Sequence, residues 1–478
     1  MSTNRLPTQA DDFPAWYVEV VKRAELAEHG PAKGSMIMRP HGYAIWELTQ
    51  RALDDRFKAT GHENLYFPLL IPMSLLEREA DHVEGFAPQV AVVTHGGGEK
   101  LEEPLAIRPT SEAIIWHTYK RWIQSYRDMP LLYNQWGNVV RWEMRTRLFL
   151  RTSEFLWQEG HTAHATSGEA QEEALRMLEV YREVAEDVLA IPVHKGRKSA
   201  RERFPGAVET YPIEGLMRDA KALQCGTSHF LGQNFAKAYD VTFLNADGQQ
   251  DHAWATSWGF SARMVGGTIM AHGDDAGLRL PPAVAPIQVV IVPIYRSEEE
   301  RDSVMGVAER IRTELAAQGI RIRVDDRDQH RPGYKFAEWE LKGVPVRIEL
   351  GPRDVAADRV VLAERTGGEK AEVPVAEAIA GMRARLDAVQ AKLFDEALAY
   401  REANTHEITS FAAFSSGVAE QGGFWRGAWC GEGACEAEIA SRTKATIRFL
   451  PLEPTDPGTA CMHCGKPGVD VAHWARAY

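Results

Sequence analysis

The chain has 478 residues, 44% of them hydrophobic and 26% charged, with a formal net charge of −12. This length predicts several packed units rather than one core, and no apolar run approaches the roughly 18 residues of a membrane span. The acidic total argues against a protein that coats nucleic acid, while the polar N-terminus lacks a secretory signal's apolar core, so we expect a cytoplasmic protein with no membrane partner.

The first predicted elements lie between residues 35 and 72. A helix is predicted around residues 43 to 59, ended by Gly61, and an apolar strand, LYFPLLIP, follows it. Proline cannot donate a hydrogen bond to a neighbouring strand. Pro68 and Pro72 therefore predict an edge strand or an interface rather than the middle of a sheet.

Positive charge is concentrated between residues 120 and 151, a segment that contains seven basic residues and two acidic residues, Asp128 and Glu143. Within it, residues 138 to 161 (NVVRWEMRTRLFLRTSEFLWQEGH) are predicted to be extended, which puts alternate side chains on opposite faces. Such a charged face is either a solvated edge or a site for an anion. The second alternative follows from the arginines, because guanidinium groups bind phosphate or carboxylate with paired hydrogen bonds. The charged face would hold Arg141, Glu143, Arg145 and Arg147, and the other face Trp142, Met144 and Leu148.

Further along, residues 169 to 190 have helical apolar spacing and predict a packing helix. The segment LPPAVAP, residues 280 to 286, marks a boundary, after which strands and helices alternate. This alternation favours a compact α/β domain with a largely parallel sheet. A long charged helix is predicted after about residue 380.

Four of the five cysteines lie near the C-terminus, at Cys430, Cys435, Cys461 and Cys464. The pattern C-x4-C, 25 residues, C-x2-C suits a tetrahedral zinc ion, and four thiolates leave no open position, which predicts structural Zn²⁺. His463 could replace one thiolate, and the alternative is four free thiols.

Three segments in order resemble the motifs of class II aminoacyl-tRNA synthetases: residues 42 to 72 (motif 1), Arg141 to Arg151 (motif 2) and residues 257 to 282, SWGFSARMVGGTIMAHGDDAGLRLPP (motif 3). The resemblance implies a homodimer formed by motif 1, and ATP held with Mg²⁺. It places Arg141 on the α-phosphate, Arg263 on the γ-phosphate and Glu143 near adenine. Gly266 and Gly267 alone could equally reflect close helix packing, but Arg263 in an apolar stretch calls for an anionic partner. The ATP-binding residues implied are Arg141, Glu143, Arg151, Thr152, Gln224, Thr227, Ser261 and Arg263, with Arg141 and Arg263 catalytic.

Three shorter segments resemble the prolyl-tRNA synthetase family: RPTSE at 108 to 112, FLWQEGHTAH at 155 to 164 and CGTSHFLGQNF at 225 to 235. Proline has a compact ring and a secondary ammonium, so its site needs an aromatic wall and a carboxylate, for which Trp157 and Glu112 are candidates. Alternatively, Trp157 is core and Glu112 caps a helix. The spacing of Glu159, His161 and His164 does not match the metal signature HExxH. The implied L-proline site is Thr110, Glu112, Arg141, Trp157, Glu159, His161 and His229.

The resemblance covers essentially the whole chain and implies a multidomain α/β and α+β protein. Its parts would be an antiparallel-sheet class II catalytic domain (1–283), an α/β anticodon-binding domain (284–382) and a small zinc-containing C-terminal domain (383–478). The implied partner is tRNA(Pro), with Glu340 and Arg347 as candidates for contacting anticodon bases or for a solvated face. Too few residues separate motifs 2 and 3 to hold an inserted editing domain, so the chain resembles the archaeal and eukaryotic type, which lacks that insertion. The resemblance also implies that Tyr478 folds back toward the active site.

Two alternatives stay open. A synthetase for threonine, serine or glycine would share the three motifs but should differ at the TSE and TSH segments. A catalytically silent synthetase-like subunit should have lost Arg141, Glu143 or Arg263, and all three are present.

Overall fold

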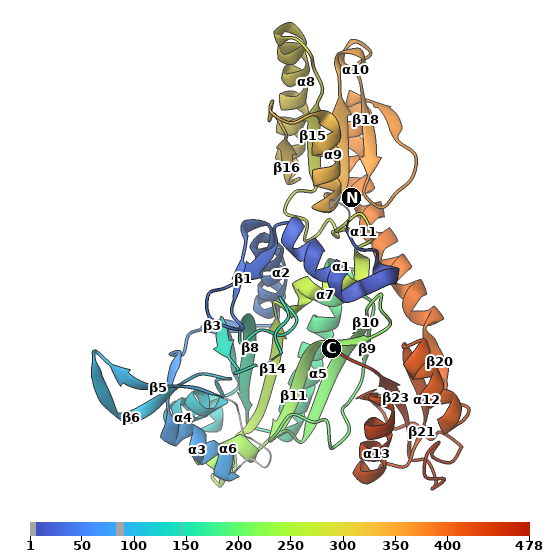
Figure 1. The fold of residues 1–478 in the computed structure, drawn as a ribbon. Helices are drawn as coiled ribbons and strands as arrows, with labels where there is room; N and C mark the ends of the chain where they lie inside the picture. The colour runs from blue at the N-terminus through green and yellow to red at the C-terminus, as the bar shows by residue number, and fades with distance from the viewer. Residues whose placement is uncertain (1–5, 83–89, 144) are drawn as a thin grey trace.

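A computed structural model describes residues 6–82, 90–143 and 145–478. Figure 1 shows a large N-terminal body around one twisted sheet, a second body above it, and a C-terminal body in orange and red beside the sheet. No helix among the described residues combines the length and apolar character that crossing a membrane requires.

The N-terminal body is built on a seven-stranded sheet with the order β3-β7-β8-β14-β11-β10-β9. Only the β3–β7 pair is parallel, so the predicted antiparallel catalytic sheet is confirmed. Its elements are α1 Gln9–Arg23, β1 Ala27–His29, β2 Met36–Met38, α2 Pro40–Ala59, β3 Glu63–Leu65, β4 Leu70–Pro72, α3 Met73–His82, β5 Ala91–Gly96, β6 Glu99–Ile107, α4 Glu112–Trp122, η1 Tyr126–Asp128, β7 Leu131–Val140, β8 Glu154–His164, α5 Ser167–Glu183, η2 Val184–Val188, β9 Val193–Lys195, β10 Glu209–Leu216, β11 Ala222–Gly232, α6 Asn234–Tyr239, β12 Thr242–Leu244, β13 Gln250–His252, β14 Trp254–Ser261 and α7 Arg263–His272.

Two sequence predictions in this body need correction. Of LYFPLLIP, residues 65–72, only Leu65, the last residue of β3, and Leu70–Pro72, which form β4, lie in strands. Both strands are at the edges of different sheets, so the edge prediction is confirmed and the single strand is wrong. Residues 138 to 161 are not one strand either, because β7 ends at Val140 and β8 begins at Glu154. Between them the chain turns back on itself, with Phe149 at φ 62° and paired backbone hydrogen bonds between Arg147 and Arg151 of 2.7 and 2.9 Å. The two-faced strand is therefore wrong, and Met144 lies outside the described residues.

The predicted helix over 169 to 190 is confirmed as α5, continued by η2. Thr166 caps α5: its side chain accepts from Glu169 N, while Glu169 accepts from Thr166 N at 3.1 Å. Buried α5 residues join α1, α2 and α7 in the largest apolar core, around Trp16, Tyr181 and Trp258.

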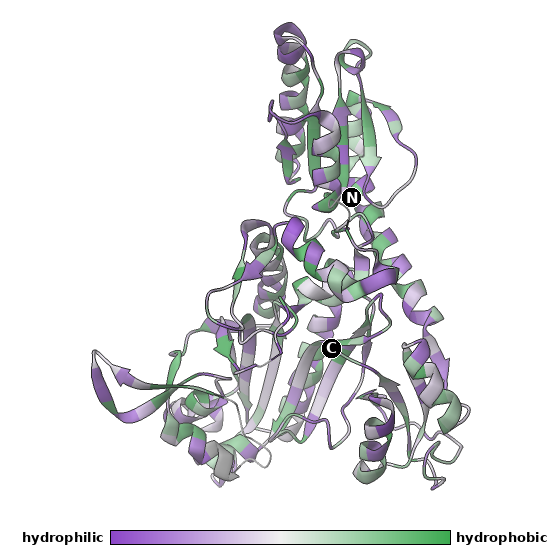
Figure 2. Ribbon diagram, in the orientation of Figure 1, coloured by the Kyte–Doolittle hydropathy of each residue, from purple (hydrophilic) through white to green (hydrophobic). Residues whose placement is uncertain are grey.

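The second body has a five-stranded sheet with the order β16-β15-β17-β18-β19. The three strands predicted from the sequence are parallel, whereas β18 and β19 add antiparallel pairs, so the sheet is mixed rather than largely parallel. Figure 2 shows β15 mainly in apolar colours, which agrees with its burial on both faces. The elements are β15 Val289–Pro293, α8 Glu298–Ala317, β16 Ile322–Val324, α9 Pro332–Leu341, β17 Val346–Leu350, α10 Pro352–Ala356, β18 Arg359–Glu364 and β19 Ala371–Pro374.

The predicted long charged helix is α11 Val375–Ala403, which leads from the second body to the C-terminal body (Figure 1). There a four-stranded sheet with the order β20-β21-β23-β22 packs against two helices. The elements are β20 Thr405–Glu407, α12 Phe411–Glu420, β21 Phe424–Trp429, α13 Gly433–Thr443, β22 Thr446–Phe449 and β23 Asp470–Ala475.

Candidate active site

A cavity of about 250 Å³ lies on the seven-stranded sheet, over β8, β11 and β14 and beside the N-termini of α4 and α7. A second cavity of about 210 Å³ adjoins it and shares Arg141, Ser261 and Arg263 with it. Together they bring side by side every residue implied for proline or ATP. The first cavity is lined by Thr110, Glu112, Arg141, Trp157, Glu159, His161, Gln224, Thr227, His229, Ser261 and Arg263, and the second adds Glu143, Arg151 and Thr152.

The pleat of the sheet explains this convergence. Trp157, Glu159 and His161 alternate along β8, so all three point to the same face. Gly259 of β14 lies between Glu159 and Thr227 of β11 in register. With no side chain at Gly259, the floor of the cavity stays open between them.

Glu159 is held by three neighbours. Its carboxylate accepts from Ser111 N at 3.1 Å and from the Ser111 hydroxyl, from Gln135 Nε2 at 2.9 Å, and pairs with His161 Nε2 at 3.0 Å. Burial alone would raise the pKa of Glu159, but the bonds from His161, Ser111 and Gln135 bring it below its ordinary value. Glu159 therefore fixes the turn that carries Glu112.

Glu112 is buried at the first position of α4, where it accepts a hydrogen bond from the Thr110 hydroxyl. Ligand atoms of Glu112, Glu159 and His161 lie within 4.8 Å of one another, a distance that could suit a metal. Since Ser111, Gln135 and His161 already occupy the Glu159 oxygens, this arrangement favours hydrogen bonding over metal ligation.

Arg141 and Arg263 present two guanidinium groups to the cavities. Arg141 donates Nε to Pro109 O at 3.0 Å and lies over the Trp157 ring at 5.3 Å, and Arg263 donates Nε to Leu150 O at 3.1 Å. Among the described residues, neither forms an ion pair with a carboxylate. Desolvation first, then the charges of Arg141 and Arg151, lower the pKa of Arg263. Such mutually repelling cations create a site for a polyanion.

The glycines of α7 serve close packing, as the sequence allowed. A Cβ at Gly266 would lie 2.7 Å from Leu150 Cδ2, and one at Gly267 would lie 2.9 Å from Leu223 Cδ2. Packing at Gly266 brings the 141–153 loop against α7, and the same loop supplies the carbonyl of Leu150 that orients Arg263. Packing and anion binding therefore share this motif.

The sequence analysis missed one wall of the cavity, which comes from the loop between β9 and β10. His229 Nδ1 hydrogen-bonds Thr210 Oγ1 at 3.0 Å, and its ring lies 4.7 Å from the Phe204 ring. Burial lowers the pKa of His229 to about 3, so the ring is neutral at physiological pH. No local periodicity distinguishes this charged loop from a surface loop; a lone phenylalanine among charges is its only signal. The missed residues of this wall are Lys198, Glu202, Arg203 and Phe204 from the loop and Thr210 from β10. Seven further lining residues were also not predicted for the site: Phe155, Cys225, Gly226, Ser257, Trp258, Gly259 and Phe260.

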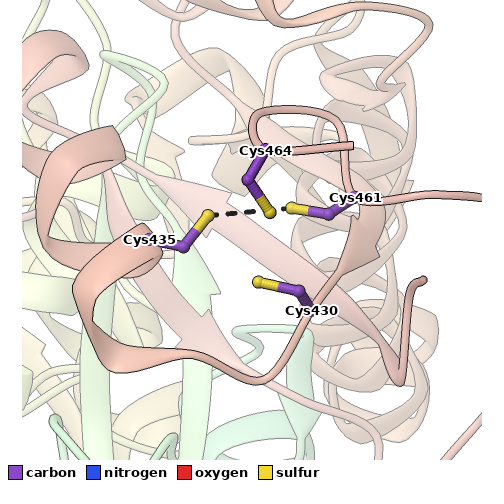
Figure 3. A group of neighbouring side chains, drawn as sticks. All are labelled: Cys430, Cys435, Cys461 and Cys464. Atoms are coloured by element: carbon purple, nitrogen blue, oxygen red, sulfur yellow. Dashed lines mark hydrogen bonds between the residues drawn. The ribbon is translucent and has the colours of Figure 1, made fainter. Parts of the chain in front are cut away.

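Figure 3 shows the four C-terminal cysteines with their sulfurs pointing toward one another. The sulfurs lie within 4.8 Å of one another, and Cys435 Sγ is 3.8 Å from Cys461 Sγ. Tetrahedral zinc with Zn–S of 2.3 Å separates its sulfurs by about 3.8 Å, so the donor set and its spacing fit this metal. His463 Nε2 lies 3.2 Å from a Glu438 carboxylate oxygen, and its ring is tilted against the Phe411 ring at 4.8 Å, which leaves the four thiols as the candidate ligands.

Three family models match the chain: the tRNA synthetase class II core domain (G, H, P, S and T) over residues 95–272, the anticodon binding domain over 288–385, and the prolyl-tRNA synthetase C-terminal domain over 412–478. Proline–tRNA ligases of Amoebophilus asiaticus and Porphyromonas gingivalis (strain ATCC 33277) are 53% and 54% identical, each over 99% of both chains. The chain belongs to the prolyl-tRNA synthetase family. A solved prolyl-tRNA synthetase from Cryptosporidium parvum, complexed with halofuginone and AMPPNP, matches at a TM-score of 0.94 and 38% identity over 99% of both chains. The predicted prolyl-tRNA synthetase family and the class II multidomain fold are thereby confirmed, whereas the archaeal and eukaryotic type and the zinc of the C-terminal domain stay predictions.

Two further predictions for this prolyl-tRNA synthetase family member concern residues outside the cavities. Glu340 is exposed on α9, whereas Arg347 on β17 pairs with Glu349 at 2.9 Å and lies 4.4 Å from the Phe336 ring. Tyr478 lies with its ring 5.8 Å from Arg147 and 5.2 Å from Lys221, so the C-terminus does reach the 141–153 loop.

Proposed function

We propose that the chain activates L-proline with ATP and transfers it to tRNA(Pro). The observation that carries this proposal is the two guanidinium groups of Arg141 and Arg263, which form no ion pair with a carboxylate among the described residues. They lie beside a pocket with an aromatic wall and a buried carboxylate. Its likeness to a relative solved with AMPPNP supports ATP as the polyanion.

In the first step, the proline carboxylate attacks the α-phosphorus of ATP, giving prolyl-adenylate and pyrophosphate. Arg141 would stabilise charge at the α-phosphate and Arg263 at the γ-phosphate, while Mg²⁺ supplies further charge neutralisation. Phosphoryl chemistry of this kind depends on positioning and electrostatics, so no protein nucleophile is required. Glu143, Arg151, Thr152, Gln224, Thr227 and Ser261 would bind the rest of the nucleotide.

Proline itself would lie between Trp157 and Glu112, with the ring against the indole and the ammonium at the carboxylate. Thr110 orients Glu112, and Glu159 with His161 holds the turn beneath it. His229 is neutral and would close the pocket without repelling the ammonium. In the second step, a ribose hydroxyl of the terminal adenosine of the tRNA would attack the acyl carbon, the bond from that carbon to the phosphate oxygen would break, and AMP would leave.

We also propose that the four cysteines bind structural zinc and that the chain has three domains, of residues 1–283, 284–382 and 383–478. Glu340 and Arg347 would contact anticodon bases. The protein would be a cytoplasmic homodimer. The exposed apolar side chains of Tyr43, Tyr66 and Leu70 in motif 1, and of Ile37 shortly before it, support the dimer. A monomer mass in sedimentation equilibrium would refute it.

A panel of amino acids in ATP–pyrophosphate exchange, and in attachment to bulk tRNA, tests the function. Proline should be preferred, and alanine should still be activated, because an apolar pocket discriminates only about 10 to 200-fold per methylene. Preference for threonine, serine or glycine would assign the chain to another class II specificity. Undetectable alanine exchange would contradict the proposed pocket.

Glu112→Gln is expected to raise the KM for proline about 10 to 100-fold, since a hydrogen bond to a charged group contributes about 1.5–3 kcal/mol. The KM for ATP should stay unchanged because the nucleotide lies nearer Arg263. Steady-state exchange kinetics measure both constants, with the exposed Glu154→Gln as the matched control. Equal increases in both constants would contradict a role specific to the ammonium.

A further inference from the structure

The loop of residues 196–208, between β9 and β10, covers the amino-acid end of the first cavity. Lys198, Glu202, Arg203 and Phe204 line the cavity. Phe204 N donates to Thr210 Oγ1 at 3.0 Å, which keeps its ring against His229. The loop has no helix and an isolated bridge pairing at Arg197. Its far end is held by hydrogen bonds from Val208 N to Phe230 O at 2.9 Å and from Asn234 Nδ2 to Gly206 O at 3.0 Å, so the position of its entry depends on separate contacts.

The entry of this loop is attached to the C-terminal body, which lies beside β9 and β10 in Figure 1. Arg197 N donates to Leu450 O at 2.9 Å and Leu450 N donates to Arg197 O at 2.8 Å. The Ser199 hydroxyl donates to Glu436 Oε1 at 2.9 Å. A Cβ at Gly196 would lie 2.3 Å from Leu450 O, so this close backbone approach requires glycine there.

A buried charged group completes the attachment. Lys198 Nζ donates to Glu214 Oε1 at 2.9 Å and to Arg448 O at 2.8 Å, and Arg448 Nη2 donates to both Glu214 oxygens at 2.9 and 3.1 Å. Glu214 is fully buried and Lys198 is 3% exposed. Two cations share one carboxylate, so removing the Arg448 side chain leaves a balanced Lys198–Glu214 pair and the buried charge remains compensated.

We propose that the C-terminal body positions the wall of the amino-acid pocket, with Arg448 and Glu436 acting as positioning residues through Glu214, Lys198 and Ser199. The proposal rests on the proposed function, since the pocket is taken to bind proline. Because these contacts already order the loop, binding of the amino acid does not include the free-energy cost of ordering it. Arg141 and Arg263 sit on other elements, so ATP binding should be insensitive to this attachment.

The test is Arg448→Met in proline-dependent ATP–pyrophosphate exchange. We expect the KM for proline to rise about 10-fold, the effect of leaving one or two loop residues to be ordered on binding, with the KM for ATP unchanged. Arg448→Lys should recover part of the loss because it keeps a cation near Glu214. Arg426→Ala, which removes an exposed arginine of the same body, is the matched control and should leave both constants unchanged.

Hydrogen exchange of residues 196–208, measured without substrates, provides a readout that does not depend on activity. The proposal requires faster exchange of this segment in Arg448→Met than in wild type. Unchanged exchange and an unchanged KM for proline would overturn it, as would equal rises in the KM for proline and for ATP. If Arg448→Met does not fold, Ser199→Ala, which removes one hydrogen bond, is judged by the same criteria. Absence of proline-dependent exchange in wild type would refute the proposed function, while the hydrogen-exchange comparison still decides the attachment.

Discussion

Arg263→Ala is expected to reduce proline-dependent ATP–pyrophosphate exchange by about 100-fold or more, the effect of removing one preorganised donor from a developing charge. Arg263 stands at the first position of α7, is oriented by Leu150 O at 3.1 Å and faces Arg141 and Arg151 across the adjoining cavities. A triphosphate bound there would have charge partners along its length. Loss of one of these partners should destabilise the transition state more than the bound ground state, because more charge develops on the phosphate oxygens in the transition state.

The variant should nevertheless fold well. Arg141 and Arg151 disfavour the charged form of Arg263, so removing its guanidinium relieves repulsion in the unliganded protein. We therefore expect a melting temperature equal to or above that of wild type together with the loss of exchange. Arg263→Lys should recover only part of the activity, because lysine lacks the paired donors. Near-normal exchange by Arg263→Ala would refute the assignment of motif 3, and the exposed Arg121→Ala serves as the matched control.

The sequence was most informative where a side chain's position follows from local periodicity. Trp157, Glu159 and His161 are two apart, so strand geometry alone puts them on one face once β8 is recognised. The cysteine spacing likewise indicated a four-ligand cluster, and the structure brings the sulfurs together. Resemblance supplied what periodicity does not, namely that Glu112, Arg141 and Arg263 meet although they lie far apart in the chain.

Prediction failed where long-range contacts determine the backbone. The residues after Val140 alternate in polarity like a strand, yet the chain folds back there. The backbones of Arg147 and Arg151 form paired hydrogen bonds, and Phe149 and Leu150 pack against Gly266 of α7. Phe204 lies in a segment whose only local signal is a lone phenylalanine among charges, and its place in the cavity depends on Thr210 and His229. Its anchor, Leu450, is some 250 residues away in the sequence, a distance no local pattern can bridge.

The second large effect is expected on removing the zinc ion proposed for the C-terminal body. Cys430, Cys435 and Cys461 are buried in the same core as Trp429 and Trp474, and Cys464 completes the cluster from the surface. Burial raises the pKa of Cys430 and of Cys435, whereas backbone hydrogen bonds from Cys464, His463 and Cys430 outweigh burial and lower the pKa of Cys461 to about 7. Zinc binds the thiolate form, so a bound ion would compensate the burial of these charges. Besides the cysteines, the turn at Cys461 is linked to α13 and its N-cap through the His463–Glu438 and Lys466–Glu432 pairs.

Purified protein should therefore contain one zinc per chain, measured by inductively coupled plasma mass spectrometry, and Cys461→Ser should lose it. Structural zinc contributes on the order of 10 kcal/mol to small zinc domains, so chelation should unfold the C-terminal body at a temperature well below the main transition. Cys225→Ser changes the one cysteine outside the cluster and should keep its zinc, which makes it the matched control. Protein without stoichiometric zinc, whose melting curve is unchanged by added metal, would instead identify the cluster as four free thiols packed in an apolar core.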